Sequence, residues 1–224
     1  MSGSRELILG NIRKGLRRGA LSGDALADCA ERLAAPRPNL IPARAAALDH
    51  AGQLALFVQM ASEAAALVHR VEAAAEVPAL VAGIVDAAAL PRQLVCAPAA
   101  AIAGLDWQGA GLQAQARAAR QGDRVSVTPA FAGIAETGTL MLLSGAHSPT
   151  SLNFLPDLHI VVLSATRVLA SYEEAFALWR RESAGEVPRT INLITGPSRS
   201  ADIEQKLQMG AHGPIQLHIV LLGA

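Results

Sequence analysis

A series of short apolar runs that carry almost no charge constrains the fold of this chain more than any other feature. His159 to Leu163 is apolar at every position after the histidine, which is typical of a strand buried on both faces in a parallel sheet. A helical segment, Tyr172 to Glu182, follows the cap residue Ser171. Further strand patterns are found at Gln93 to Ala97, Val125 to Thr128, Thr139 to Leu143, Thr190 to Ile194 and Leu217 to Leu222. This alternation of strands and helices predicts an α/β fold, a sheet with helices on its faces.

The first third of the chain is predicted to be helical. Periodic apolar residues favour helices over Ser4 to Arg18 and over Asp24 to Leu33, the second capped by Ser22. The connector 35–39 contains two prolines, which forbid helix continuation. A long helical pattern from about Ala45 to Ala75 is too apolar to stand free in solvent, so it must pack on the protein or on a partner. We therefore expect an N-terminal helical region, residues 1–75, that packs on an α/β domain, residues 76–224.

Charge and composition exclude several classes of function. The 19 Lys and Arg residues balance the 19 Asp and Glu residues, so the basic surface of a nucleic-acid-binding protein is not expected. The mean hydropathy is +0.31, but the uncharged stretch Thr137 to Pro156 is broken by glycines and prolines and predicts no membrane span. The N-terminal segment lacks a secretory apolar run. We expect a cytoplasmic protein that binds neither nucleic acid nor membrane.

Metal sites and cofactors bound by this chain are also not expected. Cys29 and Cys96 are the two cysteines, too few for a zinc or iron–sulfur site built from this chain alone. No pair of histidines has the spacing of a metal-binding helix. For His159 and His218, each in a strand pattern, we expect buried and hydrogen-bonded side chains.

The loop Ala135 to Thr139 is the first candidate for a functional site, since ligands of open α/β folds bind beyond the carboxyl ends of strands. Gly138 allows close approach of the backbone to a ligand, and Thr137 and Thr139 offer hydroxyls beside it. Glu136 is an isolated acid in an apolar stretch and is a candidate base or nucleophile. The alternative is that Glu136 pairs with an arginine and Gly138 only makes a turn.

The second candidate loop, residues 195–204, directly follows a strand pattern and opens a short predicted helix. Hydroxyls of Thr195 and Ser198, the backbone at Gly196, and the Arg199 guanidinium suit a carboxylate or phosphate ligand. The alternative is a capping arrangement in which Arg199 pairs with Asp202. We favour the binding role, and include Asp202 among the binding residues, because so many polar groups follow one apolar strand.

His212 is the histidine best placed to face a ligand. It lies in the tight turn His212-Gly213-Pro214 just before the last strand pattern. Together with Glu136, it is a candidate for moving a proton in a reaction. No nucleophile elbow of the Gly-x-Ser-x-Gly type is present, so a serine hydrolase is not expected.

Four segments taken in order resemble those of one protein family. They are Ala135-Glu136-Thr137-Gly138-Thr139-Leu140, residues 155–162 (LPDLHIVV), residues 195–204 (TGPSRSADIE), and Gly210-Ala211-His212-Gly213-Pro214 with Leu217-His218. The series closely resembles the lactate-utilisation protein C family (LutC/YkgG), whose core is the LUD domain. The resemblance covers about the C-terminal half of the chain.

The resemblance implies a Rossmann-like layered sheet similar to that of the sugar-phosphate isomerase and CoA-transferase superfamily. It also implies action with two partner subunits, at least one carrying iron–sulfur clusters, in the oxidation of L-lactate to pyruvate. The small cysteine count agrees with clusters held by partners. The family supplies no established catalytic residues, so the candidate residues above rest on their position and chemistry.

Three functions follow as hypotheses. The first is a subunit of a lactate-oxidising system in which Arg199 and its neighbours hold a small carboxylate. The second is a stand-alone enzyme of the superfamily, for acyl-CoA transfer or sugar-phosphate chemistry, with Glu136 as its nucleophile. The third is an assembly module without an active site that docks through the apolar helix expected between Ala45 and Ala75.

Overall fold

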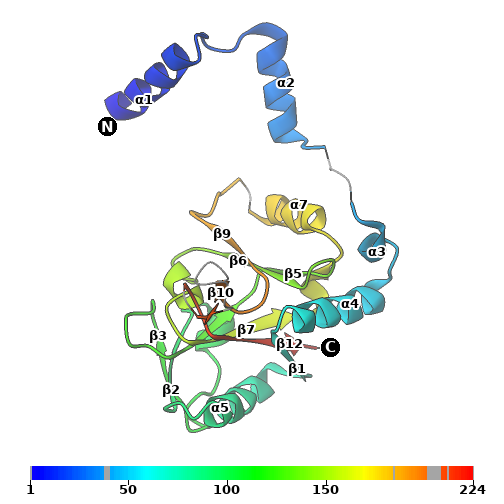
Figure 1. The fold of residues 1–224 in the computed structure, drawn as a ribbon, viewed down its shortest axis with the longest axis vertical. Helices are drawn as coiled ribbons and strands as arrows, with labels where there is room; N and C mark the ends of the chain where they lie inside the picture. The colour runs from blue at the N-terminus through cyan, green and yellow to red at the C-terminus, as the bar shows by residue number, and fades with distance from the viewer. Residues whose placement is uncertain (1, 38–40, 184, 201–207, 211, 224) are drawn as a thin grey trace. The chain divides into compact units, whose positions relative to one another are not determined.

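A computed structural model describes residues 2–37, 41–183, 185–200, 208–210 and 212–223, and it contains two compact units, Met1–Leu40 and Ile41–Ala224. The first unit holds the helices α1 (Ser2–Gly15) and α2 (Gly23–Ala34), as predicted (Figure 1). Ser22 occupies the N-cap of α2 with an extended backbone, but its side chain makes no capping hydrogen bond. In the described chain no helix combines the length and apolar character that a membrane crossing requires.

A parallel sheet forms the centre of the second unit. Its described strands run in the order β1-β12-β7-β4-β2-β3, and every neighbouring pair is parallel. The strands are β1 (Leu67–Val71), β12 (Gln216–Leu222), β7 (Leu158–Ser164), β4 (Val125–Pro129), β2 (Gln93–Cys96) and β3 (Gln113–Ala116). The predicted α/β fold is confirmed, and β7 is buried on both faces as its apolar run indicates.

The two faces of the parallel sheet are covered by different partners. Helix α5 (Val77–Ala87) and the short α6 (Ala100–Ala103) pack on one face, where Val81 joins a core cluster with Ile160. On the other face Val161 packs in a second cluster with Phe57 of α4 (His50–Glu63). Alternate residues of one strand therefore point into two separate cores.

A second, smaller sheet lies over that other face. Its described strands, in the order β8-β5-β6-β9, are β8 (Val168–Leu169), β5 (Ala132–Ile134), β6 (Thr139–Leu143) and β9 (Ile191–Ile194). The pairs β5–β6 and β6–β9 are antiparallel. Leu140 packs toward the parallel sheet, whereas Met141 packs toward α7 (Tyr172–Glu182) with Phe176 and Trp179. Figure 1 shows α5 and α7 on opposite sides of the two sheets.

Two predicted strands, Thr139 to Leu143 and Thr190 to Ile194, therefore form, but in the smaller mixed sheet. The residues between β5 and β6 make a hairpin turn, and this turn sends β6 back antiparallel to β5. The strands expected in an α/β sheet are thus divided between two sheets. An apolar run shows that a strand is buried without showing which sheet contains it.

The predicted continuous helix from about Ala45 to Ala75 is wrong. The segment forms α3 (Ala43–Ala46), α4, strand β1 and the short helix η1 (Ala74–Glu76). Asp49 starts α4 by accepting a hydrogen bond from Gly52 N at 2.8 Å, and Ala65 ends it with a φ of 67°. Alanines gave the whole segment a helical pattern, but β1 gains hydrogen bonds by pairing with β12.

Four short elements complete the described chain. They are η2 (Thr150–Asn153), η3 (Ala165–Arg167) and the antiparallel pair β10 (Arg199–Ser200) and β11 (Gln208–Met209). Arg199 was expected near the start of a helix and lies instead in β10. The rest of that predicted helix falls on residues 201–207, outside the described residues.

Candidate functional site

A cavity of about 240 Å³ lies where the amino ends of β7 and β12 meet the carboxyl end of β9. Its polar lining comes from four predicted residues and two others: Thr195, Gly196, Ser198, His212, Asn153 and His159. The second candidate loop and the turn before β12 therefore converge on one cavity, as expected for a site. The position differs from the expected one, because the parallel strands reach this cavity with their amino ends.

His159 contributes a buried, neutral imidazole to the cavity wall. Its side chain is 0% exposed, and burial lowers its pKa to about 3. Nε2 lies 2.8 Å from the Thr128 hydroxyl, so the predicted buried and hydrogen-bonded histidine is confirmed. Nδ1 is buried and has no partner among the described residues. Its place at the cavity was not predicted, because a histidine in an apolar strand gives no sign of what it faces.

Asn153 brings a second buried polar group without a partner. It ends the short helix η2 and is 2% exposed, and its Oδ1 makes no hydrogen bond to the described residues. The Ser126 hydroxyl holds η2 on the sheet by donating to Leu152 O at 2.7 Å. An unsatisfied buried polar group costs about 1–3 kcal/mol, so a ligand that pairs with it gains affinity. Asn153 was not predicted, although it is a polar residue in the uncharged stretch before β7.

The two glycines of the candidate loops lie against α4. Gly138 has a φ of 66°, and a Cβ there would lie 2.2 Å from Ala61 N. Gly196 has a φ of 72°, and its Cβ would lie 2.0 Å from Ala64 O. Both positions require glycine, because left-handed backbone and close packing exclude other side chains. Close approach to a ligand was predicted at Gly138, whereas the structure places the backbone of α4 against this glycine.

Glu136 is buried at the start of α7 and is not among the residues that line the cavity. Its side chain is 5% exposed, and Oε1 accepts a hydrogen bond from Tyr172 N at 3.1 Å. The Arg44 guanidinium donates to the backbone carbonyl of Glu136. The arginine contact therefore exists, but it does not involve the carboxylate. Oε2 is buried without a partner among the described residues.

Four hydroxyls connect the two candidate loops. Thr139 Oγ1 lies 2.6 Å from Thr195 Oγ1, 2.7 Å from Thr137 Oγ1 and 2.9 Å from the Tyr172 hydroxyl. Thr137 Oγ1 also donates to the Tyr172 hydroxyl at 3.1 Å. The antiparallel register of β6 and β9 places Thr139 beside Thr195, since Leu140 pairs with Ile194. Tyr172 was not predicted, and only its position directly after the helix cap marks it in the sequence.

Arg199 fixes the second loop to α4. Its guanidinium donates to Ala64 O at 2.7 Å, where α4 ends, and the residue is exposed. A cation near a helix C-terminus is favourable, because the last carbonyls carry partial negative charge. Arg199 does not line the cavity. Its predicted alternative partner, Asp202, lies outside the described residues.

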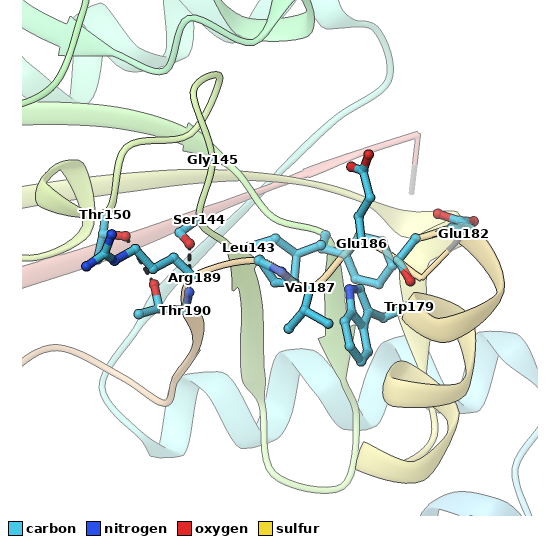
Figure 2. Close-up of a pocket in the computed structure, with 13 residues that line it drawn as sticks. Leu143, Ser144, Gly145, Thr150, Trp179, Glu182, Glu186, Val187, Arg189 and Thr190 are labelled. Carbon is cyan, nitrogen blue, oxygen red and sulfur yellow. Dashed lines mark hydrogen bonds between the residues drawn. The ribbon is translucent and has the colours of Figure 1, made fainter. Parts of the chain in front are cut away.

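A larger and more open pocket of about 890 Å³ contains none of the predicted residues (Figure 2). It lies between the end of α7, with Trp179 and Glu182, and the segment that leads into β9. Thr190 N donates to Ser144 Oγ at 2.8 Å and ties that segment to the end of β6. Val187 in its wall is 77% exposed. The smaller cavity is the better candidate, because it holds the buried polar groups without partners.

A second histidine pair lies away from the cavity, on β1 and β12. His69 Nε2 is 3.0 Å from His218 Nδ1, and the two rings are stacked with centroids 5.2 Å apart. His218 is 6% exposed, so the predicted buried and hydrogen-bonded histidine is confirmed. Burial lowers the pKa of both histidines, to about 4 for His218. Within the described ranges, no three His, Cys, Asp or Glu residues are grouped to hold a metal ion. Burial of Cys96 also raises the pKa of its thiol.

Sequence comparison identifies the family of the second unit. The LUD domain matches residues 54–222, which include both sheets and every residue that lines the cavity. The chain belongs to the LUD domain family. The predicted resemblance is thereby confirmed.

Several curated relatives of this LUD domain are named Lactate utilization protein C. The protein from Geobacillus kaustophilus is 36% identical over 104 residues, which cover 45% of this chain and 43% of that protein. The protein from Bacillus subtilis is 35% identical over 100 residues, covering 44% and 42%. The matched segments thus span less than half of the length of these relatives.

A solved structure has the same fold. It is a DUF162 family protein from Deinococcus radiodurans, with a TM-score of 0.56 and 23% identity, and the match covers 79% of this chain and 99% of that one. This likeness supports the α/β architecture with its parallel sheet.

Proposed function

We propose that this LUD domain protein takes part in lactate utilisation by binding a small hydroxy acid in the cavity of about 240 Å³. The proposal is carried by one observation: residues of the predicted loops converge there with two buried polar side chains that have no partner in the described chain. Relatives named Lactate utilization protein C indicate the substrate class.

The size of the cavity agrees with a small ligand. Pockets for drug-sized molecules occupy about 300–1,000 Å³, so a volume of about 240 Å³ suits a molecule of a few carbon atoms. The apolar part of the wall includes Leu193, Ile194 and Leu217, which would contact a methyl group. A three-carbon hydroxy acid has the required combination of one apolar and two polar ends.

The polar residues divide into two groups by burial. Ser198 and His212 line the cavity with half-buried and exposed side chains, and we assign them to the carboxylate, to which both can donate. His159 and Asn153 are buried, and we assign them to the hydroxyl end of the ligand. Arg199 then acts indirectly, by holding the loop of Gly196 on α4.

Electron transfer in this proposal belongs to partner proteins. Oxidation of lactate to pyruvate removes two electrons, and iron–sulfur clusters on partner subunits would accept them, as the family resemblance implies. Such clusters are held by cysteine thiolates, and this chain has two cysteines in all, of which Cys96 is buried. The chain would bring the hydroxy acid to a complex whose redox centres lie elsewhere.

Calorimetric titration of the full chain with L-lactate tests the binding site. Asn153→Leu keeps the side-chain size and removes its polar atoms, and we expect at least tenfold weaker binding. Asn192→Leu is the matched control, since Asn192 also has a buried side-chain atom without a described partner but does not line the cavity. Absence of binding by L-lactate, glycolate and pyruvate would refute the site.

The role in a complex needs a separate experiment. Co-expression with the products of neighbouring genes, followed by lactate-dependent reduction of an artificial electron acceptor, should show activity that requires this chain. Activity that requires the chain without any acid binding by it would favour the assembly-module hypothesis.

One observation favours a second candidate, acyl-CoA transfer at Glu136. Oε2 of Glu136 is buried without a described partner, and the layered sheet agrees with the proposed relationship to the CoA-transferase superfamily. Its carboxylate would attack an acyl thioester and release the CoA thiolate, which leaves an acyl-glutamyl anhydride. The thiolate would then attack the glutamyl carbonyl, expel the acyl group as a free carboxylate and form a glutamyl thioester. Mass spectrometry after incubation with acyl-CoA donors should detect this adduct on Glu136, and its absence with a panel of donors counts against the candidate.

A further inference from the structure

The four hydroxyls of Thr137, Thr139, Tyr172 and Thr195 form a hydroxyl cluster that reaches the cavity at Thr195. The number of protons in this cluster determines whether Thr195 offers the cavity a hydrogen-bond donor or an acceptor. Thr137, Thr139 and Tyr172 form a closed triangle of hydrogen bonds, with oxygen separations of 2.7, 2.9 and 3.1 Å. Thr195 is attached to the triangle by one bond, 2.6 Å from Thr139. Thr195 also lines the cavity, whereas Thr139 is 0% exposed.

Each hydroxyl has one proton to donate. Four hydroxyls supply four protons, and the cluster contains four hydrogen bonds, so every proton is used inside the cluster. Thr195 takes part in a single one of these bonds and must therefore be its donor. The triangle then runs in one direction, from Thr137 to Tyr172, from Tyr172 to Thr139 and from Thr139 back to Thr137, which agrees with Thr137 as the donor to Tyr172.

This direction leaves the lone pairs of Thr195 Oγ1 available toward the cavity, while its proton points to Thr139. We infer that Thr195 is a specificity-determining residue that offers a hydrogen-bond acceptor, so that the cavity selects small carboxylates with a hydroxyl donor over those with a carbonyl at the same position. The inference rests on the proposed function, because it concerns the ligand of the same cavity.

The chemical consequence is discrimination between a 2-hydroxy acid and its 2-oxo counterpart. The hydroxyl of lactate can donate to Thr195 Oγ1, whereas the keto oxygen of pyruvate can only accept and would face the lone pairs of Thr195. A site built to pair with a hydroxyl rejects analogues that lack it. Because Thr195 is exposed at the cavity, water competes for its oxygen, and we expect about a tenfold preference, the effect of one hydrogen bond.

Calorimetric titrations with L-lactate, pyruvate and 2-methoxypropanoate test this inference on the full chain. Pyruvate is no larger than lactate, whereas 2-methoxypropanoate is larger, and neither compound has a hydroxyl donor. A difference in ligand size therefore cannot explain weaker binding of both. We expect each to bind about tenfold more weakly than lactate. Equal binding of lactate and pyruvate would overturn the inference and leave the proposed function in place. Absence of binding by all three would overturn both.

Substitutions at Thr195 assign the preference to its hydroxyl. Thr195→Val should abolish the preference, because it removes the acceptor for the lactate hydroxyl and also the lone pairs that face the keto oxygen of pyruvate. Thr195→Ser should retain the preference. Thr150→Val is the matched control. It removes a threonine hydroxyl whose oxygen lies 3.2 Å from Thr190 Oγ1, and Thr150 does not line the cavity. A preference for lactate that persists in Thr195→Val would show that another group reads the hydroxyl and would overturn the role of Thr195.

Discussion

The two sheets of this protein differ in where they hold their polar side chains. The six-stranded parallel sheet has them in its interior, where Thr128, His159 and His218 are buried between apolar residues. The four-stranded mixed sheet gathers its hydroxyls at one end, with Thr139 on β6 beside Thr195 after β9. The candidate cavity lies between the two sheets' polar regions. Its walls therefore combine the neutral, buried His159 of the parallel sheet with exposed loop residues.

This difference shows how a site forms without a motif in one segment. The parallel sheet supplies rigid, desolvated groups, because its strands are covered on both faces. The mixed sheet supplies hydroxyls on turns that α4 holds in place through Gly138 and Gly196. If the two sheets have these separate roles, substitutions in each sheet should affect the protein differently.

The largest effect is expected in the core of the parallel sheet. Ile160 is 0% exposed and packs under α5, so Ile160→Ala should lower the free energy of unfolding by about 2–5 kcal/mol through lost contacts and a cavity. Leu193→Ala on β9 of the mixed sheet should cost less than about 1 kcal/mol, because Leu193 is 44% exposed. Urea denaturation measures both. Equal losses would contradict the contrast between the sheets.

The hairpin turn of the mixed sheet should be the next most sensitive position. Gly138→Ala should cost about 2–4 kcal/mol, because a Cβ meets the backbone of α4 and the residue has a left-handed φ. Gly83→Ala in α5 has open space around its Cβ and should stabilise the protein by up to about 1 kcal/mol. If both variants unfold at the same denaturant concentration as the wild type, α4 does not hold this turn.

The buried histidines of the parallel sheet should make stability depend on pH. The folded-state pKa is about 3 for His159 and about 4 for His218, below the ordinary value of 6.5. Below pH 6.5 the unfolded chain binds protons that the folded chain does not, so the free energy of unfolding falls as pH falls, by up to about 1.4 kcal/mol per pH unit for each histidine until its folded pKa is reached.

The measurement is denaturation at several pH values between about 4.5 and 7, a range that lies above both folded-state pKa values and includes the ordinary value of the unfolded chain. His159→Gln should remove one contribution to the slope and leave those of His69 and His218. A slope that His159→Gln does not reduce would show that His159 is charged in the folded protein.

The smallest effect is expected from the hydroxyl cluster. Tyr172→Phe removes the two hydrogen bonds that the Tyr172 hydroxyl makes and should cost about 1–2 kcal/mol. Thr166→Val removes an exposed hydroxyl that pairs with Ser164 at 2.9 Å and should change stability by less than about 0.5 kcal/mol. Thermal unfolding compares the two, and identical midpoints would mean that the cluster does not stabilise the mixed sheet.

Local sequence patterns predicted the elements of this fold well where a short apolar run or a cap marks them. The helix Tyr172–Glu182 has the predicted bounds, and Ser171 caps it by accepting a hydrogen bond from Glu174 N. The pattern failed between Ala45 and Ala75, because alanine favours helix locally whereas the pairing of β1 with β12 depends on residues about 150 positions away.

The candidate site was predicted in part for the same reason. Thr195, Ser198 and His212 are polar residues after or before strands, and position along the chain was enough to select them. Asn153 and His159 could not be selected, since their role depends on which neighbours leave Oδ1 and Nδ1 without a hydrogen-bond partner.

The sequence by itself determined the family, the α/β class and the polar segments from which a site could be built. Only the tertiary structure decided that the apolar runs divide between two sheets and that the polar segments meet at the amino ends of β7 and β12. The physical reason is that burial and periodicity are local properties of a chain, whereas strand pairing and hydrogen-bond satisfaction are decided by groups far apart in sequence.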